Sequence, residues 1–545
     1  MSLRAPAMFL LPGMLFGLWI ARNHAAPLGG PLLIAAIFLG FSLWFNQRRN
    51  HSAAWALCFF VGSTLLFWAY GTVRFPTHRN AANLAMPERE AILKIDVERV
   101  FGEMTIYRNS SGIGTIREAS QTSPLQTKSR IYFRVRIPEE SDYRLRRGQK
   151  LQLKGVLYPI AADVSNDSFE GYLKSIGIDY TFERSSELEL LKRAPWLDRF
   201  CMHMNDRFDE YLRLGVPADT RITNIYVAML LGKKAALTDE QNERFRMTGT
   251  MHFFAISGLH IGVIATMIAQ CLLVIRVPRR YSPWIGLPLL YLYVEITGAS
   301  PSAVRAFLMT ACFWLSFAIV RQRSPLGALA ASAVAVLILA PEQLWSLGFQ
   351  LSYTVVLSIL LFGLPLYERL FNSYSPFQWL PKDNWSVWQR AVHWSFDKCL
   401  LVFSISFSAW LASAPLSAEM SGFIAPSAVL INMLLVNLAA LVIIGGVIGL
   451  SLAAAGLGLV ASFTNHSAWV CLSLMDWFVT LSLAIPGSVI VCENFPRALS
   501  YFGVVGYSAI LFWLNADPER FQNRTVWTAP IYICTILITG VLLGN

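Results

Sequence analysis

The stretch Phe253 to Ile275, FFAISGLHIGVIATMIAQCLLVI, is long enough to cross a lipid bilayer as one helix. It is almost wholly apolar, yet Ser257 and His260 lie one helical turn apart within it. Polar side chains at membrane depth are costly, so they need a partner or a function. On a helical wheel, small residues share one narrow face opposite His260: Ala255, Gly258, Gly262, Ala265 and Ala269. The pattern predicts a membrane helix with one face for close helix packing and a polar pair that faces either another helix or a wet interior.

Composition places the whole chain among polytopic membrane proteins. Hydrophobic residues make up 55% of the 545 residues, charged residues only 14%, and the mean hydropathy is +0.47. We expect spans near residues 7–21, 31–46, 53–73, 251–275, 283–298, 303–320, 325–341, 344–365, 398–418, 424–443, 445–463, 466–486, 500–514 and 527–543. The first run could pass for a signal peptide core. A second apolar run follows from Pro31 without a cleavage pattern and polar mature chain, so we expect an uncleaved span.

Motifs for metals, disulfides and nucleotides are missing from the sequence. The eight cysteines form no CxxC pair, and no His/Cys cluster has metal-ligand spacing. There is also no phosphate-binding GxxxxGK[ST] loop. We therefore expect no metal site, no disulfide framework and no cofactor, and any ATP-driven pulling would have to come from a cytoplasmic partner.

Four segments follow from the hydropathy pattern. We expect an N-terminal membrane segment over 1–73, a hydrophilic domain over 74–195, interfacial helices over 196–250 and a larger membrane domain over 251–545. The short loops with Arg48-Arg49, Arg276–Arg280 and Arg321–Arg323 can all be cytoplasmic if residues 74–195 lie outside. Three separate loops thus predict the same orientation.

The hydrophilic segment alternates like a set of strands. Apolar and polar side chains alternate in the first half of 91–101, along 130–137 and again in 149–157, with turn residues between these runs. The pattern predicts a small β-barrel of about five strands. Tyr132 and Phe133 in the second run could stack on nucleic acid bases or belong to the barrel core.

Basic residues crowd one part of this segment. Nine cations and three acids lie between Lys128 and Lys154, a balance that suits a polyanion. An equally good interpretation is a solvated strand edge whose charges prevent aggregation. The candidate DNA-binding residues are Lys128, Arg130, Arg134, Arg136, Arg144, Arg146, Arg147 and Lys150.

Two short helices are expected before the central span. Residues 197–212 repeat apolar side chains at helical spacing with charges between them, which predicts an amphipathic helix at the membrane surface or beneath the barrel. Thr238 and Gln241 predict a capping box at the start of the next helix. Cations near this helix are candidate phosphate contacts or plain interfacial anchors: Lys233, Lys234, Arg244 and Arg246.

The hairpin EITGASPSAVRAFLM, residues 295–309, is the second informative site. Gly298 should end one helix, and Ser300 should cap the next. Glu295 then sits near a helix C-terminus and Arg305 just past a helix N-terminus, each on the side that its charge should avoid. We expect either a structural Glu295–Arg305 ion pair or, with Arg305 as the sharper hypothesis, a lining for phosphates.

Other polar residues at membrane depth extend the set of candidates. Together with Ser257, His260, Glu295 and Arg305, the channel-lining candidates are Gln350, Tyr353, Glu419, Asn432 and Asn437. Most such residues in membrane proteins form hydrogen bonds between helices.

These stretches resemble the competence membrane domain of the ComEC family. The matching motifs are TDEQNERFRMTG, MHFFAISGLHIGVIA, TGASPSAVRAFLM, RQRSPLGALA, PEQLWSLGFQLSYTVVL and APLSAEMSGFIAPSAVLINMLLVNLAAL, in order along residues 222–450. Upstream, three spans and a β segment ending DSFEGYLKSIGIDYTF resemble that family's N-terminal region, which holds an OB-fold outside the inner membrane. The resemblance thus covers most of the chain.

The resemblance implies an inner-membrane channel that passes single-stranded DNA into the cytoplasm during natural transformation. It implies an extracytoplasmic DNA receptor and a cytoplasmic helicase-like motor as partners, beside membrane lipids, and leaves open a homo-oligomer. Many members continue into a metallo-β-lactamase-like domain proposed to degrade the other strand. This sequence has no HxHxDH motif, so we expect no nuclease chemistry here and a separate nuclease.

Two other classes of function stay open at this point. A transporter or flippase of another anionic substrate would fit the basic segment and the intramembrane polar groups equally well. An intramembrane hydrolase could use Ser257 and His260, but the sequence has no GxSxG elbow and no acid with a defined role beside His260.

Overall fold

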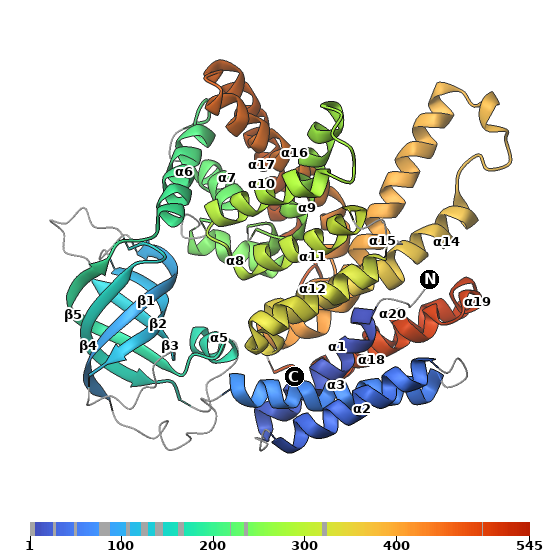
Figure 1. Ribbon diagram of the computed structural model, residues 1–545. Coiled ribbons are helices and arrows are strands. Elements are labelled where there is room, and N and C mark those ends of the chain that lie inside the picture. The colour runs from blue at the N-terminus through green and yellow to red at the C-terminus, as the bar shows by residue number, and fades with distance from the viewer. Residues whose placement is uncertain are drawn as a thin grey trace.

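The computed structural model describes residues 6–24, 29–47, 52–75, 88–104, 109–120, 129–136, 145–161, 168–217, 220–233, 238–254, 256–318, 324–492 and 494–544. Lys128, Arg144, Lys234 and Ala255 fall outside these ranges, as do the loops at 48–51 and 319–323. The described chain is a polytopic helical protein that carries a small β-barrel (Figure 1). This confirms the predicted fold class.

The barrel is closed, with strand order β1-β2-β3-β5-β4. Its elements are β1 (Arg89–Met104), β2 (Asn109–Ala119), β3 (Arg130–Arg136), β4 (Lys150–Pro159), α5 (Phe169–Ser175) and β5 (Tyr180–Lys192). Neighbouring strands are antiparallel except β3 and β5, which run parallel. This order is OB-fold-like, and the alternating side chains that predicted it fill the interior.

The structure shows the roles of two aromatic residues in β3 and of one glycine in β2. Phe133 is 0% exposed in the barrel interior, whereas Tyr132 is 5% exposed on the other face of β3, where it packs against α5, so neither ring is available to stack on a base. At Gly112, a Cβ would lie 2.4 Å from the Arg99 carbonyl oxygen, so β1 and β2 approach more closely there than any side chain allows.

The helical part is built from α1 (Pro6–Asn23), α2 (Gly29–Gln47), α3 (Ser52–Arg74), α6 (Trp196–Leu212), α7 (Arg221–Leu231), α8 (Asp239–Met247), η3 (Met251–Phe253), α9 (Gly258–Val274), α10 (Ser282–Ile296), α11 (Pro301–Ala318), α12 (Pro325–Leu339), η4 (Pro341–Trp345), α13 (Leu347–Ser358), η5 (Ile359–Gly363), α14 (Leu364–Tyr374), η6 (Lys382–Asn384), α15 (Val387–Ser421), α16 (Ala428–Ala454), α17 (Gly458–Leu483), α18 (Arg497–Asn515), α19 (Pro518–Gln522), η7 (Arg524–Trp527) and α20 (Thr528–Gly544). The short strands β6 (Phe423–Ile424) and β7 (Ile490–Val491) pair between helices. Among the described residues, seven helical segments are long and apolar enough to cross a membrane.

Three of the predicted spans differ from the structure. The runs at 424–443 and 445–463 are not separate helices, because α16 continues without a break from Ala428 to Ala454. The glycines at 445 and 446 misled the prediction: a Cβ at Gly446 would lie 2.2 Å from Leu230 Cδ1, so this glycine permits a close helix contact rather than a turn. The run at 253–275 is not one helix either, since η3 ends at Phe253 and α9 begins at Gly258.

The helices surround a central region, with α6 and α17 on one side of it and α1, α2 and α3 on the other (Figure 1). The barrel lies at one end, and the turn between α14 and α15 projects at the opposite end. Ion pairs join the barrel to the helices, among them Arg130 Nη1 to Glu342 Oε1 at 3.5 Å. The largest of the buried apolar clusters joins α7, α9, α10, α11, α16 and α17, so these helices pack around a common core.

Candidate functional site

A cavity of approximately 1160 Å³ lies between the barrel and the helices. The barrel contributes β1, α5 and the loop with Arg147, and α6 forms another part of the wall. The remaining wall consists of helix ends, including the end of α10, the start of α11, the junction of η4 with α13 and the start of α18. Helix ends of both polarities meet there, so the charge of the cavity is set by side chains.

Cations outnumber acids in the described lining. The cationic lining residues are Arg22, Arg99, Arg147, Lys174, Lys233, Arg305 and Arg497. The acidic ones are Asp198, Asp206, Glu295 and Glu419. The excess of positive charge in a confined, partly apolar space favours an anionic ligand.

Arg305 is the most informative of these residues. It is 5% exposed, and its Nε and Nη2 each donate to Ser352 Oγ at 3.2 Å. No carboxylate among the described residues pairs with it. Gly348 makes room for it, because a Cβ there would lie 3.0 Å from Arg305 Nη2. A buried guanidinium without a counter-charge is costly, so its position at a cavity wall points to an anion that binds there.

The predicted Glu295–Arg305 ion pair is not present. Glu295 Oε2 instead accepts from Arg147 Nη1 at 2.7 Å, and Arg147 also lies 3.8 Å from Asp198. The loop that carries Arg147 is 148 residues away from Glu295 in sequence, so local reasoning on the hairpin could not find it. The pair fastens the barrel to α10. Burial raises the pKa of Asp198, the Arg147 charge opposes this rise, and Glu295 adds to it.

Most of the predicted cations on the barrel have acidic partners. Arg130 pairs with Glu98 and Glu342, Arg134 with Glu183 and Lys150 with Asp96. These acids lie on β1, β5 and η4, far from the basic run in sequence. Of the candidates in the described part of the chain, Arg136 and Arg146 show no ion pair with another described residue. The local charge count therefore overestimated the free positive charge of the barrel.

Ser257 and His260 form a helix cap. Ser257 is the N-cap of α9, and His260 Nδ1 lies 3.1 Å from Ser257 Oγ and 3.3 Å from the Ser257 backbone nitrogen. His260 is 0% exposed, and its ring approaches the Met229 backbone of α7. His260 thus faces another helix, one of the two surroundings expected for the polar pair, and Ala265 of the small-residue face is buried. Close helix packing was wrongly expected at Gly258 and Gly262, where a Cβ would meet nothing within 4 Å. Neither Ser257 nor His260 is among the cavity-lining residues.

The other predicted intramembrane residues divide into two groups. Gln350 and Glu419 line the cavity, with Gln350 Nε2 donating to the Leu344 carbonyl at 3.2 Å. Tyr353 donates to Ser332 Oγ of α12 at 3.3 Å, an interhelical bond of the kind expected. Asn437 donates to the Met433 carbonyl within its own helix, and Asn432 lies on the same helix with a buried Oδ1. These last three residues do not line the cavity.

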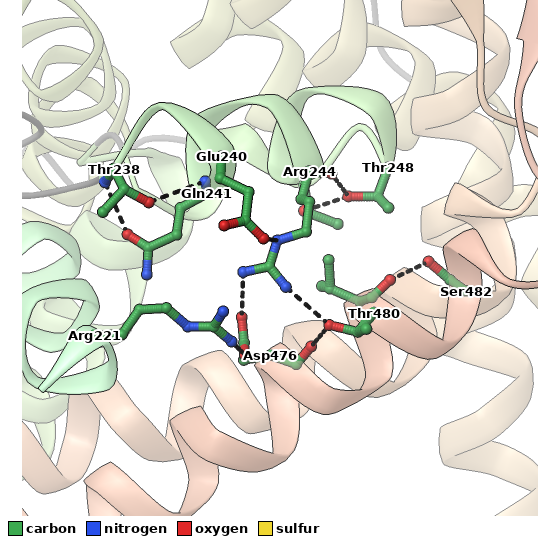
Figure 2. A network of polar contacts seen from close by, with 11 residues as sticks. Arg221, Thr238, Glu240, Gln241, Arg244, Thr248, Asp476, Thr480 and Ser482 are labelled. Atoms are coloured by element: carbon green, nitrogen blue, oxygen red, sulfur yellow. Dashed lines mark hydrogen bonds and ion pairs between the residues drawn. The ribbon is translucent and has the colours of Figure 1, made fainter.

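An ionic network centred on the largely buried Asp476 and Arg244 joins α7, α8 and α17 (Figure 2). Asp476 accepts a hydrogen bond from Arg221 and lies 3.6 Å from Arg244 Nη2. Arg244 Nη1 also donates to Thr480 Oγ1 at 3.1 Å, and the predicted capping box of Thr238 and Gln241 is present at the start of α8. Arg244 is thus a structural residue, one of the two interpretations that its sequence position allowed.

Two neighbouring cations are paired as well. Arg246 forms a two-point contact with Glu243 at 3.0 Å through both Nε and Nη2. Lys233 donates to Asp209 Oδ2 at 2.8 Å. Burial acts to raise the pKa of Asp209, but hydrogen bonds from Lys233 and Arg213 outweigh it, so that this pKa lies below its usual range.

Four cavity cations were missed from the sequence. Arg22 and Arg497 lie at ends of apolar helices and resembled ordinary flanking charges, and Arg99 and Lys174 lie outside the basic run. Only the fold brings them together. One sequence signal could have identified Arg22 and Arg497. Both lie at helix ends on the barrel side, and the positive-inside rule explains cations only on the cytoplasmic side.

The fold defines a polytopic membrane protein with a small barrel, and the cavity between barrel and helices has more cations than acids in its described lining. The family model described as Competence protein matches residues 229–517, just over half of the chain, and the chain belongs to that family. It is 33% identical over 147 residues to ComE operon protein 3 of Bacillus subtilis (strain 168), covering 27% of this chain and 19% of that protein. It is 29% identical over 173 residues to an uncharacterized protein of Aquifex aeolicus (strain VF5), covering 31% of this chain and 40% of that protein.

These alignments span about a fifth and two fifths of the relatives' own lengths. No solved structure matches this chain.

Proposed function

We propose that this protein passes single-stranded DNA across the bacterial inner membrane during natural transformation, and that the cavity between barrel and helices is the entrance. Membership of the competence protein family supports the role in DNA uptake. The observation that carries the position of the entrance is Arg305, a buried guanidinium without an acidic partner among the described residues at the wall of a cavity of about 1160 Å³.

Physical requirements of DNA passage agree with this assignment. A phosphate chain cannot cross hydrocarbon without a polar path, because each desolvated charge costs many kcal/mol. The path must also hold the chain weakly enough to let it move. Cations that are partly neutralised by neighbouring carboxylates meet both needs, as Arg147 with Glu295 and Lys233 with Asp209 illustrate.

The orientation belongs to the same proposal. α9 begins and α10 ends on the cavity side, so the basic segment Arg276–Arg280 lies at the far end of both helices. With that end in the cytoplasm, the barrel and the cavity face outward and receive incoming DNA. An outer DNA receptor, a cytoplasmic helicase-like motor and a separate nuclease are the partners that this function requires.

The test is entry of fluorescent DNA into cells that lack the gene, complemented with the wild type or with Arg305→Gln at matched membrane abundance. Arg199→Gln is the matched control, because Arg199 is an exposed cation of α6 outside the cavity lining. We expect the deletion to stall DNA outside the inner membrane, wild type and Arg199→Gln to restore entry, and Arg305→Gln to restore little. Normal entry in the deletion strain would contradict the proposal and redirect the search to other anionic substrates.

A further inference from the structure

Arg22 and Arg497 bring two positive charges together at the cavity. Arg22 is the penultimate residue of α1, and Arg497 is the first residue of α18. Both line the cavity, and their charges are close enough to act unfavourably on each other. Such an arrangement costs free energy unless an anion lies between or beside the two groups.

Arg22 is held in place by aromatic rings. Its guanidinium carbon lies 4.4 Å from the centre of the Trp345 ring, and the Phe75 ring meets Trp345 edge-on at 5.4 Å. No ion pair joins Arg22 to an acid in the described part of the chain, and the attraction of Asp179 is a smaller effect on it than the repulsion of Arg497. The side chain is therefore positioned without being neutralised.

Arg497 is only partly neutralised. Its Nε lies 3.7 Å from Glu419 Oε1, a long contact for an ion pair, and its guanidinium carbon lies 5.7 Å from the Tyr501 ring centre. The Arg497 side chain is 61% exposed, so it can turn toward a ligand, whereas the Glu419 side chain is 9% exposed. The long contact with Glu419 and the high exposure of Arg497 leave its guanidinium group able to bind an anion in the cavity.

We propose that Arg22 and Arg497 form a phosphate-binding subsite in the cavity wall, where a phosphodiester is held between α1 and α18. Two planar guanidinium groups match the geometry of phosphate oxygens better than single point charges do. The inference rests on the proposed function for the identity of the ligand as the backbone of single-stranded DNA. The same chemistry would accept the phosphodiester of a phospholipid headgroup.

The subsite would join two parts of the chain. Arg22 lies in the N-terminal helices, outside residues 229–517, and Arg497 lies within them. The N-terminal segment would thus contribute directly to ligand binding instead of serving only as a membrane anchor.

The test uses the full-length protein in lipid nanodiscs, with wild type, Arg22→Gln/Arg497→Gln and the matched control Arg193→Gln/Arg199→Gln. The control removes two exposed cations that do not line the cavity. Binding of fluorescent oligothymidylate is measured against salt concentration, and a methylphosphonate oligothymidylate without backbone charge is the second probe. Phosphatidylglycerol that remains bound after purification is measured by native mass spectrometry. Arg497→Gln alone is the fallback if the double variant does not fold, since Arg497 is largely exposed.

We expect the double variant to bind oligothymidylate at least about tenfold more weakly than the control. The slope of log affinity against log salt is negative, and its magnitude should decrease by about 0.7 for each phosphate group that the variant no longer binds. The uncharged probe should bind weakly and equally to all three proteins. A decrease in bound phosphatidylglycerol with unchanged DNA affinity would keep the phosphate subsite and assign it to lipid. Unchanged DNA affinity together with unchanged lipid content would overturn the subsite, and it would do so even if the deletion strain fails to import DNA.

Discussion

At the level of one residue, substitution of Arg305 distinguishes a role in ligand binding from a role in stability. Replacing it with Gln removes a buried charge that has no acidic partner among the described residues, so the thermal stability of the protein should stay the same or rise. DNA entry should fall by about ten- to hundredfold, because a charged hydrogen bond to phosphate contributes about 1.5 to 3 kcal/mol and about 1.4 kcal/mol is tenfold. Arg305→Lys should retain part of the activity. A stability loss that parallels the uptake loss would mean that Arg305 is structural.

Asp209 predicts a defined response to acid. Its pKa is lowered in the folded state, so the carboxylate form stabilises the fold. This contribution is fully present above the ordinary value of 3.8 and is lost as the pH falls through the lowered one. The difference in melting temperature between wild type and Asp209→Asn should therefore be constant from neutral pH down to about 4 and should shrink below it. A difference that disappears already between about pH 7 and 5 would contradict this assignment.

Asp476 should be important for stability and not for ligand contact. Asp476→Asn would leave Arg244, whose side chain is 16% exposed, without its buried partner. We expect a loss of about 3 kcal/mol in unfolding free energy. Glu243→Gln is the control, because both side chains of its pair with Arg246 are 52% exposed, and it should cost less than about 1 kcal/mol. Equal effects of the two substitutions on thermal unfolding would argue against a buried network.

The sequence located polar residues at membrane depth but not their partners. Arg305, Gln350 and Glu419 were predicted as lining and do line the cavity. Glu295 and Arg147 were both singled out, yet their pairing depends on how the barrel docks onto α10. Pairings across long sequence separations follow from tertiary structure, which local spacing does not encode.

At the scale of an element, α9 shows how a polar pair starts a helix within a membrane domain. Because Ser257 is an N-cap, Ser257→Ala should cost about 1 kcal/mol and leave DNA entry nearly unchanged at matched abundance. Thermal unfolding and DNA entry, both measured on Ser257→Ala, test whether Ser257 acts only as a helix cap. Complete loss of function at normal stability would revive the hydrolase hypothesis for Ser257 and His260.

Elements with a strong period were predicted more reliably than those with special residues. Alternation predicted β1, β3 and β4, and the capping box predicted the start of α8. Glycine pairs misled the prediction in α16, where Gly446 permits close approach of Leu230. A glycine within an apolar run can mark either a turn or a close contact between two helices, so the sequence alone does not distinguish these two cases.

At the scale of the molecule, the barrel, the N-terminal helices and the family domain all contribute residues to the lining of the cavity. The fold class was predictable because hydropathy and alternation are properties of the whole chain. The cavity was not, since its charged lining comes from Arg22 near the start of the chain, Arg147 on the barrel and Arg497 near the end.

The most direct test of this account is photo-crosslinking of DNA in transit. A photoreactive amino acid is placed at Ser302, which lines the cavity, or at Ser467, an exposed position of α17 outside it. Transforming cells are irradiated during uptake, and protein–DNA adducts are quantified. We expect adducts with single-stranded DNA at position 302 and few at position 467. The adducts at position 302 should form only while DNA is being imported. Import that proceeds normally without adducts at 302 would contradict the claim that the cavity is the entrance for DNA.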